Sequence, residues 1–317
     1  MTKLVIQIPC LDEGKTLGAT LQALPKALPG IDSIEIVIID DGSTDDTVAV
    51  ARAHGVSRIV SMHRNQGLAR AFMAGIEESL RADADIVVNT DADNQYSAAD
   101  IGALVAPILD GRADMVVGAR PISDIGHFSP IKKTLQALGS WVVRLASNTN
   151  VADAPSGFRA FSREAAEQLN VFSNYTYTLE TLIQAGRKGM AVLSVPVRVN
   201  QPTRPSRLIR SIGSYVRQSI VTIVRIFIIY KPFRFFAWLG SIVFLAGAAL
   251  GVRFLYFYVT GSGSGHIQSL ILASMLMSMG FIVVIAGILA DLIAVNRVLL
   301  ERIDMRLRRL ERRDDRR

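Results

Sequence analysis

The sequence predicts an α/β fold, in which a mostly parallel β-sheet with helices on both faces is followed by an amphipathic helix and a hairpin of two membrane-spanning helices. Three observations support this prediction. Short apolar runs alternate with helical patterns over residues 1–200, which is typical of a parallel sheet covered on both sides. Two long apolar segments occupy much of the last third of the chain. An arginine-rich segment lies between the two parts.

The alternation in residues 1–200 defines the elements of the sheet. Each strand candidate is a short apolar run, and each helix candidate repeats apolar residues at steps of three and four. The predicted strands are Leu4–Ile8, Ile34–Ile39, Arg58–Ser61, Ile86–Thr90, Met115–Gly118 and Val192–Val197. The predicted helices are Lys15–Leu28, Asp45–Ala53, Leu68–Leu80, Ala98–Leu109, Ile131–Ser147 and Thr178–Gly186. Ligands of such sheets bind beyond the carboxyl ends of the strands, so the residues just after each strand are the functional candidates.

Charge is distributed unevenly along the chain. The 35 Lys and Arg against 28 Asp and Glu give a net charge of +7, which taken alone suggests a nucleic-acid partner. Residues 1–200, however, hold 18 basic and 22 acidic side chains, whereas residues 201–234 hold 7 basic and no acidic ones. The positive charge therefore belongs to a short segment and the C-terminal tail, and we expect no nucleic acid to bind.

The two apolar segments predict an integral membrane protein. Residues 235–259 contain one charge, Arg253, and residues 267–290 contain none. Each is longer than the ~20 residues that cross a ~30 Å hydrocarbon core. Basic residues flank the pair outside its connecting loop: Lys231, Arg234, Arg297 and Arg302. The positive-inside rule then predicts that both termini and the α/β part are cytoplasmic, at a bacterial-type inner membrane or its equivalent. Two buried helices of a soluble core are the alternative.

The arginine-rich segment predicts a helix that lies in the membrane interface. One face would carry Arg207, Arg210, Ser214, Arg217, Gln218 and Arg225. The other would carry Leu208, Ile209, Ile212, Val216, Ile220, Ile223 and Phe227. Such a helix binds anionic lipid through its cations and buries its apolar face; a core-facing helix is the alternative. We thus expect four regions: an α/β domain (1–200), a basic amphipathic region (201–234), two membrane helices (235–293) and a charged cytoplasmic tail (294–317).

Acidic residues follow three of the predicted strands, at Glu13, Asp41 and Asp91. Like charges gathered at one sheet edge repel one another unless a cation or hydrogen-bond donors join them. Asp91, Asp93 and Gln95 recur at every second residue, so an extended backbone places them on one face. Their oxygens suit Mg²⁺ or Mn²⁺ shared with a diphosphate. Alternatively, Asp93 and Asn94 form a turn that caps the next helix.

Asp41 also has two interpretations. It lies in Asp40-Asp41-Gly42-Ser43, a sequence suited to a strand-to-helix turn. An acid at this kind of turn commonly accepts hydrogen bonds from a nucleobase or ribose.

Taken in order, six motifs resemble those of family-2 glycosyltransferases, which have the GT-A fold, a Rossmann-like variant of the α/β class. They are Pro9…Glu13, VIIDDGSTDDT (37–47), NQG (65–67), NTDADNQY (89–96), VVGAR (116–120) and SGFR (156–159). With the amphipathic helix and the hairpin, the chain is similar to the polyprenyl-phosphate glycosyltransferases, including dolichol-phosphate mannose synthases. The resemblance implies a membrane-bound inverting enzyme that moves a sugar from a nucleotide-sugar donor to an undecaprenyl or dolichyl phosphate.

The resemblance also implies a role for each candidate residue. The nucleotide-sugar would be lined by Pro9, Leu11, Glu13, Ile39, Asp41, Asp91, Ala92 and Asp93. The metal would be held by Asp91, Asp93 and Gln95, and Asp91, Asp93 and Arg120 would be catalytic. The lipid phosphate would contact Arg120, Lys132, Lys133, Arg204 and Arg207. The sequence departs from the family at Asp12, where Asn is usual, and in TRPSR (203–207).

The implied acceptor explains why no catalytic base stands out. A phosphate monoester has its second pKa near ~6 and is already an oxyanion at neutral pH. The enzyme must instead stabilise the departing nucleoside diphosphate, which a divalent cation and arginine do.

Two other functions compete with this one. A processive polysaccharide synthase shares the fold, but the chain has no Arg-Trp pair of the Gln-x-x-Arg-Trp type, and two spans are few for a channel. A non-catalytic membrane scaffold is disfavoured by the intact Asp91, Asp93, Gln95 and Arg120. A homo-oligomer is compatible with the sequence.

Overall fold

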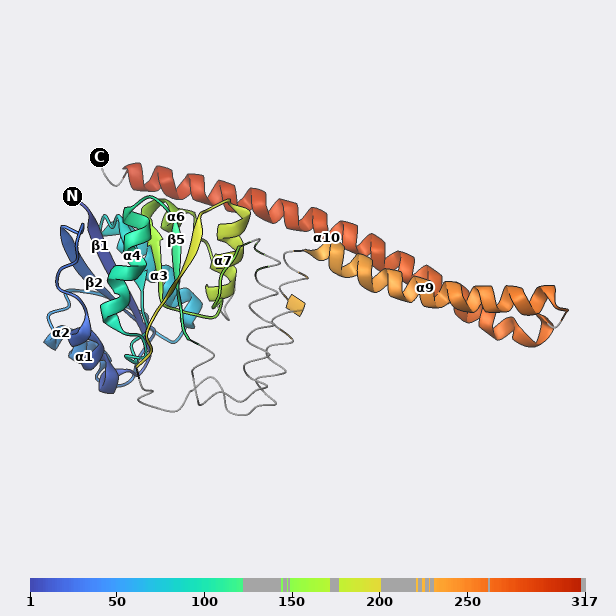
Figure 1. Ribbon diagram of the computed structural model, residues 1–317, viewed down its shortest axis with the longest axis horizontal. Helices are drawn as coiled ribbons and strands as arrows, with labels where there is room; N and C mark the ends of the chain where they lie inside the picture. The colour runs from blue at the N-terminus through green and yellow to red at the C-terminus, as the bar shows by residue number, and fades with distance from the viewer. Residues whose placement is uncertain are drawn as a thin grey trace. The chain divides into compact units, whose positions relative to one another are not determined.

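A computed structural model describes residues 1–121, 144, 147, 149–171, 177–200, 221, 224, 225, 228, 231–261 and 263–314 (Figure 1). The chain divides into two compact units, residues 1–219 and 220–317. Most of the predicted helix Ile131–Ser147 and most of the basic region 201–234 lie outside the described residues.

The first unit is built on one seven-stranded sheet. Its strands are β1 (Lys3–Cys10), β2 (Ser33–Asp40), β3 (Arg58–Ser61), β4 (Ile86–Asn89), β5 (Met115–Ala119), β6 (Arg159–Ser162) and β7 (Val192–Pro196). They lie in the order β3-β2-β1-β4-β6-β5-β7. Only β6 is antiparallel to its neighbours, β4 and β5. The mostly parallel sheet is therefore confirmed, and its strand order reverses between β1 and β4.

Helices cover both faces of this sheet, as predicted. They are α1 (Gly14–Ala23), α2 (Thr47–Ala53), α3 (Leu68–Arg81), η1 (Ala98–Asp100) with α4 (Ile101–Leu109), α6 (Arg163–Gln168) and α7 (Tyr177–Arg187). Leu17 of α1 and Leu104 of α4 share a core with Ile6 of β1. On the opposite face α3 lies over Gln7, because a Cβ at Gly75 would meet the Gln7 side chain. Alternate residues of β1 thus face two helical layers.

Three features of the first unit differ from the predicted elements. Helix α6 was not predicted, because its six residues, REAAEQ, are too few to show a helical repeat of apolar residues. Helix α1 ends at Ala23 rather than at Leu28. Leu24 is extended there, because the residue before a proline, here Pro25, disfavours the helical conformation. Strand β6 was not predicted, because its four residues, RAFS, begin and end with polar side chains and form no apolar run.

The second unit is a hairpin of two long helices, α9 (Pro232–Val259) and α10 (Ile267–Asp314), joined through the short helix η2 (Gly263–His266). Both helices are long and apolar enough to cross a membrane. Proline at position 232 starts α9, since its missing N–H is not needed in the first turn. The 48 residues of α10 continue well past the predicted second span, into the charged tail.

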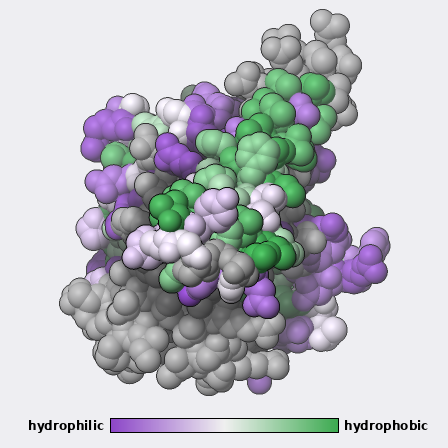
Figure 2. Space-filling view, turned by 90° about the vertical axis from the view of Figure 1, so that its right-hand side faces the viewer, coloured by the Kyte–Doolittle hydropathy of each residue, from purple (hydrophilic) through white to green (hydrophobic). Residues whose placement is uncertain are grey.

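The two helices of the hairpin pack through glycines. A Cβ on Gly240 would lie 2.7 Å from the Gly280 carbonyl oxygen, and one on Gly280 would lie 2.6 Å from the Phe244 nitrogen. The backbones therefore touch at this point, as small residues allow in membrane helices. Large apolar residues point outward instead, and Trp238 is 68% exposed. Figure 2 shows hydrophobic residues over much of the visible surface of the hairpin. Buried helices of a soluble core would not expose such residues.

Candidate active site

The carboxyl ends of three neighbouring parallel strands bring the predicted site residues to one edge of the sheet. Gln7 of β1 pairs with Val37 of β2 on one side and with Asn89 of β4 on the other. The loops that follow β1, β2 and β4 therefore leave the sheet side by side, at the point where strand order reverses. This is where open α/β sheets bind their ligands.

The first two of these loops are joined by reciprocal hydrogen bonds. The backbone N–H of Asp12 donates to the Ser43 hydroxyl at 2.9 Å, and the Asp12 carboxylate accepts from the Thr44 N–H at 2.8 Å. The N–H of Glu13 donates to the Thr47 hydroxyl at 2.9 Å. Asp12 has a φ of 52°, a conformation that Asp and Asn tolerate better than most residues. Either residue offers the accepting oxygen that this position uses.

Asp41 holds the loop that contains the NQG motif. Its two carboxylate oxygens accept hydrogen bonds from the N–H groups of Gln66 and Gly67, at 2.7 and 2.9 Å. The side chain is almost fully buried. Two motifs that lie 25 residues apart in the sequence are thus joined at this carboxylate. Its contact with a nucleobase or ribose stays a prediction.

Asp91 and Asp93 form the acidic centre of the site. The pKa of Asp91 is raised to about 7, because burial penalises its charged form and Asp93 adds a like charge. Arg120 opposes this rise in the pKa, and Glu13 adds to it. Two carboxylates that disfavour each other's charge bind a divalent cation readily. Asp93 also accepts from the Gln95 N–H at 3.1 Å, and Asn94 has a φ of 55°, so the predicted turn is present as well.

The oxygen donors of this centre fit Mg²⁺ or Mn²⁺. Among the described residues, no three His, Cys, Asp or Glu side chains cluster as a metal site. Such a cluster is not required when substrate phosphates complete the coordination, since one or two carboxylates then suffice. Asp91 and Asp93 supply two carboxylates, and Gln95, half-buried beside them, offers an amide oxygen.

Arg120 is fixed by a bidentate ion pair with Asp153. Its Nε and Nη2 atoms lie 2.6 and 3.0 Å from the two oxygens of that carboxylate. The Asp153 side chain is 1% exposed and that of Arg120 is 14% exposed. Burial acts to lower the pKa of Arg120, but Tyr96, the ion pair with Asp153 and the nearby Asp91 together keep it above its ordinary value. Asp153 was not predicted, because no sequence pattern marks its position.

The loop that contains the SGFR motif packs closely against Asp91. The Asn89 amide donates to the Gly157 carbonyl at 2.8 Å and to the Tyr177 hydroxyl at 3.0 Å. A Cβ at Gly157 would lie 2.8 Å from that hydroxyl and 3.2 Å from Asp91 Oδ1. Only glycine therefore lets this loop approach the acidic centre so closely.

Arg159, the last residue of the motif, is fully buried in β6. Its guanidinium donates to the carbonyl oxygens of Ser156, Ala154 and Thr178 and to the Thr181 hydroxyl. Burial lowers its pKa to about 10. The arginine ties the motif's loop to α7 and holds the backbone that covers Asp91.

The segment that follows β7 is hydrogen-bonded to the turn that carries Asp93 and Gln95. The N–H of Asn200 donates to the Gln95 carbonyl at 2.8 Å, and its side-chain amide donates to the Asn94 carbonyl at 2.9 Å. The Arg198 guanidinium donates to both oxygens of Asp100, from Nη2 to Oδ1 and from Nε to Oδ2. Asn200 thus holds the turn that carries Asp93 and Gln95. It was not predicted, because no sequence motif includes it.

The remaining predicted site residues are either partly or fully buried or lie outside the described residues. Pro9 and Ile39 lie within strands, and Ile39 and Ala92 are covered by neighbouring residues. Leu11 is half-buried in the first loop. Lys132, Lys133, Arg204 and Arg207 lie outside the described residues. Their assigned contacts with nucleotide and lipid stay predictions.

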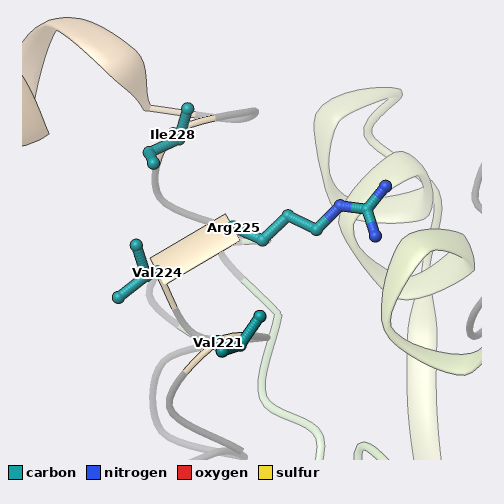
Figure 3. A pocket seen from close by; sticks show the side chains of 4 residues that line it. All are labelled: Val221, Val224, Arg225 and Ile228. Atoms are coloured by element: carbon teal, nitrogen blue, oxygen red, sulfur yellow. The ribbon is translucent and has the colours of Figure 1, made fainter. Parts of the chain in front are cut away.

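The second unit contains a hollow of its own. Val221, Val224, Arg225 and Ile228 line it (Figure 3). Figure 3 shows the Arg225 side chain extending away from Val224. The amphipathic helix predicted for this region stays a prediction, because most of its residues lie outside the described part of the chain.

A sheet with acids at its switch point, loops joined by side-chain hydrogen bonds and a buried arginine–carboxylate pair defines a nucleotide-binding α/β enzyme. Within that class, residues 5–169 match "Glycosyl transferase family 2". Because this match covers half of the chain, the protein belongs to glycosyl transferase family 2 and is a nucleotide-sugar-dependent glycosyltransferase.

Three relatives illustrate the match. An uncharacterised glycosyltransferase of Mycobacterium tuberculosis is 32% identical over 222 residues, which are 69% of this chain and 94% of the relative. The polyprenol monophosphomannose synthase of Mycolicibacterium smegmatis is 25% identical over 68% of this chain and 83% of its own. A UDP-N-acetylglucosamine–dolichyl-phosphate N-acetylglucosaminyltransferase of Methanococcus voltae is 30% identical over 51% of this chain and 73% of its own.

Solved structures share the fold. Glucosyl-3-phosphoglycerate synthase of M. tuberculosis, in complex with Mn²⁺, UDP and phosphoglyceric acid, superposes with a TM-score of 0.53 at 21% identity. The similarity covers 70% of this chain and 78% of that one. It supports the GT-A fold, while the acceptor of that enzyme is a small soluble acid.

Proposed function

We propose that this protein is an inverting glycosyltransferase that moves a sugar from a nucleotide-sugar to a polyprenyl phosphate at the cytoplasmic face of a membrane. One observation carries the proposal: an acidic strand-end site and two exposed apolar helices of membrane-spanning length occur in one chain. Relatives named for polyprenol and dolichyl phosphate acceptors support it. Mannose and N-acetylglucosamine both occur among their names, so the donor sugar is a separate question.

The acceptor's chemistry suits a site without a general base. A phosphate monoester oxygen is negatively charged at neutral pH, so it can attack the anomeric carbon without losing a proton to the protein. The bond from that carbon to the nucleoside diphosphate breaks, and the attacking oxygen forms the new bond on the opposite side. The protein's task is to orient the two phosphates and to stabilise charge on the leaving group.

Residues around Asp91 divide this task. Asp91, Asp93 and Gln95 would hold Mg²⁺ or Mn²⁺, which supplies positive charge for the leaving diphosphate. Arg120 would place a guanidinium on the diphosphate or on the acceptor phosphate. Asp153 fixes that guanidinium by both of its carboxylate oxygens. Since the pair is largely buried, Arg120 is oriented before substrate arrives, which lowers the cost of ordering it later.

The acceptor's lipid tail explains the second unit. A long hydrocarbon leaves the bilayer only at ~0.8 kcal/mol per exposed CH₂, so the acidic site must work at the membrane surface. The basic region, residues 201–234, would bind the anionic head groups there, with Arg204 and Arg207 contacting the acceptor phosphate.

The experiment is an assay of full-length protein in nanodiscs that contain polyprenyl phosphate, with a panel of nucleotide sugars and Mn²⁺. A lipid-linked sugar from at least one donor supports the proposal. No lipid product from any donor, beside an active relative in the same assay, would overturn it.

Arg207→Ala separates the acceptor role from donor binding. We expect it to raise the KM for polyprenyl phosphate several-fold while donor binding is unchanged. Arg112→Ala removes a surface arginine that pairs with Asp110 and is the matched control. Equal losses in donor and acceptor affinity would refute a specific lipid-phosphate role.

A further inference from the structure

Three buried polar side chains form a hydrogen-bonded chain that leads to the acidic centre. Its members are Gln7 of β1, Asn89 of β4 and Tyr177 of α7, and each is at most 1% exposed. The Gln7 Nε2 donates to the Asn89 Oδ1 at 2.9 Å, and the Asn89 Nδ2 donates to the Tyr177 hydroxyl at 3.0 Å. Three elements of the fold therefore meet at one asparagine, which precedes Asp91 by two residues.

Gln7 determines which way the Asn89 amide faces. Because Gln7 supplies a donor, Asn89 presents its oxygen to Gln7 and its nitrogen to the opposite side. There the Asn89 nitrogen donates to the Gly157 carbonyl at 2.8 Å, and the Tyr177 hydroxyl donates to the same carbonyl at 3.4 Å. An Asn89 amide turned by 180° would set its N–H₂ against that of Gln7 and its oxygen against the Gly157 oxygen. The chain thus holds the Gly157 carbonyl in place.

Gly157 in turn lies against the carboxylate of Asp91. A Cβ on Gly157 would lie 3.2 and 3.5 Å from the two oxygens of that carboxylate. The Gly157 N–H donates to the Tyr96 hydroxyl at 3.2 Å, so both polar groups of this residue are held. Gly157 can withdraw from Asp91 only if these hydrogen bonds break. Its backbone therefore limits the orientations that the Asp91 carboxylate can adopt.

The chain lowers the stability of the core in two ways. Among the described residues, Gln7 Oε1 has no hydrogen-bond partner, and a buried acceptor without a partner is destabilising. Room for Gln7 comes from Gly75, since a Cβ there would lie 2.6 Å from Oε1. Gly75 lies inside α3, where glycine is less stable than alanine. Apolar residues at positions 7 and 89 would avoid the unpaired acceptor, so packing alone does not explain why these positions are polar.

We propose that Gln7, Asn89 and Tyr177 are positioning residues for the divalent cation, and that they act through Gly157 by holding the Asp91 carboxylate in the orientation that binds Mg²⁺ or Mn²⁺. A carboxylate that is held before the cation arrives loses less freedom on binding, which raises affinity. The inference rests on the metal role proposed for Asp91, and the experiment tests the two separately.

Tyr177→Phe removes the hydroxyl of the chain and keeps the ring. That ring stacks on Phe72 with centroids 4.0 Å apart and planes 8° from parallel, so its packing is retained. Full-length protein in nanodiscs of zwitterionic lipid is titrated with Mn²⁺ alone, and the unbound ion is followed by electron paramagnetic resonance. We expect the Mn²⁺ dissociation constant to rise about fivefold, the effect of losing one neutral hydrogen bond.

Ser162→Ala is the matched control for a general loss of stability. The Ser162 hydroxyl accepts from the Ala165 N–H and caps α6, so its loss destabilises the first unit to a similar degree. Ser162 pairs with Ile86, at the end of β4 that lies away from Asp91. The Mn²⁺ affinity of Ser162→Ala should therefore equal that of the wild type.

Gln7→Met tests the chain at the end far from Gly157. Methionine keeps the length of the side chain but offers no N–H to Asn89, so the Asn89 amide is no longer fixed in one orientation. We expect the Mn²⁺ dissociation constant to rise in this variant as well. Because Gln7→Met and Tyr177→Phe both act through Asn89, the rise in the double variant should be smaller than the product of the two separate rises.

Two results would overturn the positioning role. One is a Mn²⁺ affinity in Tyr177→Phe equal to that of Ser162→Ala. The other is a double variant whose dissociation constant rises by the full product of the separate effects, because the two side chains would then act independently. Failure of the metal site itself looks different: wild-type protein that binds no Mn²⁺, or binds it as Asp93→Asn does, would refute that site and this inference with it.

Discussion

The two units of this protein differ in where their apolar side chains lie: they are buried in the first unit and exposed in the second. In the first unit the apolar strand residues are buried, with Leu4 and Ile6 at 0% exposure. In the second, large apolar residues such as Trp238 and Val252 are 68% exposed, while glycines occupy the helix contact. Each arrangement is stable only in its own solvent, water for the first unit and lipid for the second.

The two units also differ in which groups form their hydrogen bonds. In the hairpin the backbone bonds itself within each helix, as lipid requires. In the first unit, side chains bond across long sequence separations: Asn89 reaches Gly157, Arg120 reaches Asp153, and Asn200 reaches Asn94. Precise placement of charge therefore belongs to the first unit, and the proposed membrane anchoring belongs to the second. Variants in one unit should leave the function of the other intact.

The largest effect is expected at the acidic centre. Asp93→Asn keeps the size of the side chain but removes its charge, so transfer should fall by at least ~100-fold, the usual cost of losing charge stabilisation at a reacting group. Steady-state assays of lipid-linked product measure this. Asp110→Asn, on the surface, is the control and should retain activity. Near-normal activity of Asp93→Asn would remove Asp93 from the metal site.

The next effect is expected at the arginine–carboxylate pair. Asp153→Ala leaves Arg120 without its buried partner, and the unfolding free energy of the first unit should fall by about 3 kcal/mol. Thermal unfolding followed by near-UV circular dichroism measures this. Asp153→Asn keeps one acceptor and should lose less. Unchanged stability in Asp153→Ala would show that the pair contributes little.

A bulky residue in the hairpin should act on the second unit alone. Gly280→Leu forces α9 and α10 apart, because even a Cβ there would clash with the Phe244 backbone. We expect about 2 kcal/mol of destabilisation by overpacking and a lower yield in nanodiscs, with nucleotide binding unchanged. Gly251→Ala, whose Cβ would have its nearest neighbour at 3.9 Å, is the control. Lost nucleotide binding in Gly280→Leu would contradict the division of roles.

The smallest effect is expected at Asn200. Asn200→Ala removes the side-chain hydrogen bond to the Asn94 carbonyl and loosens the turn that carries Asp93, at a cost of about 1 kcal/mol. The Mn²⁺ concentration for half-maximal donor binding should rise about fivefold, while binding at saturating Mn²⁺ is retained. Isothermal titration measures both. Arg198→Ala, which breaks a more exposed pair, should leave this Mn²⁺ dependence unchanged.

Local patterns in the sequence predicted most of the fold. Strand β3 begins and ends at the predicted residues, and the two spans follow from apolar length alone. The sequence did not reveal β6, whose place depends on pairing with β4 and β5 rather than on its own composition. It also gave no reason to select Asp153, which lies 33 residues from Arg120, or Asn200, which lies 106 residues from Asn94. Such partners are determined by tertiary contacts, which no short motif encodes.

In the proposed reaction, an ionised lipid phosphate supplies the attacking oxygen, and no protein base is needed. The most direct test of this claim offers the nanodisc-embedded enzyme three acceptors under one donor and one metal concentration: polyprenyl phosphate, the corresponding polyprenol, and phosphoglyceric acid. We predict transfer to polyprenyl phosphate, none to the polyprenol because its hydroxyl would need a base, and none to the soluble acid. Transfer to the polyprenol, or to phosphoglyceric acid in preference to the lipid, would contradict this account.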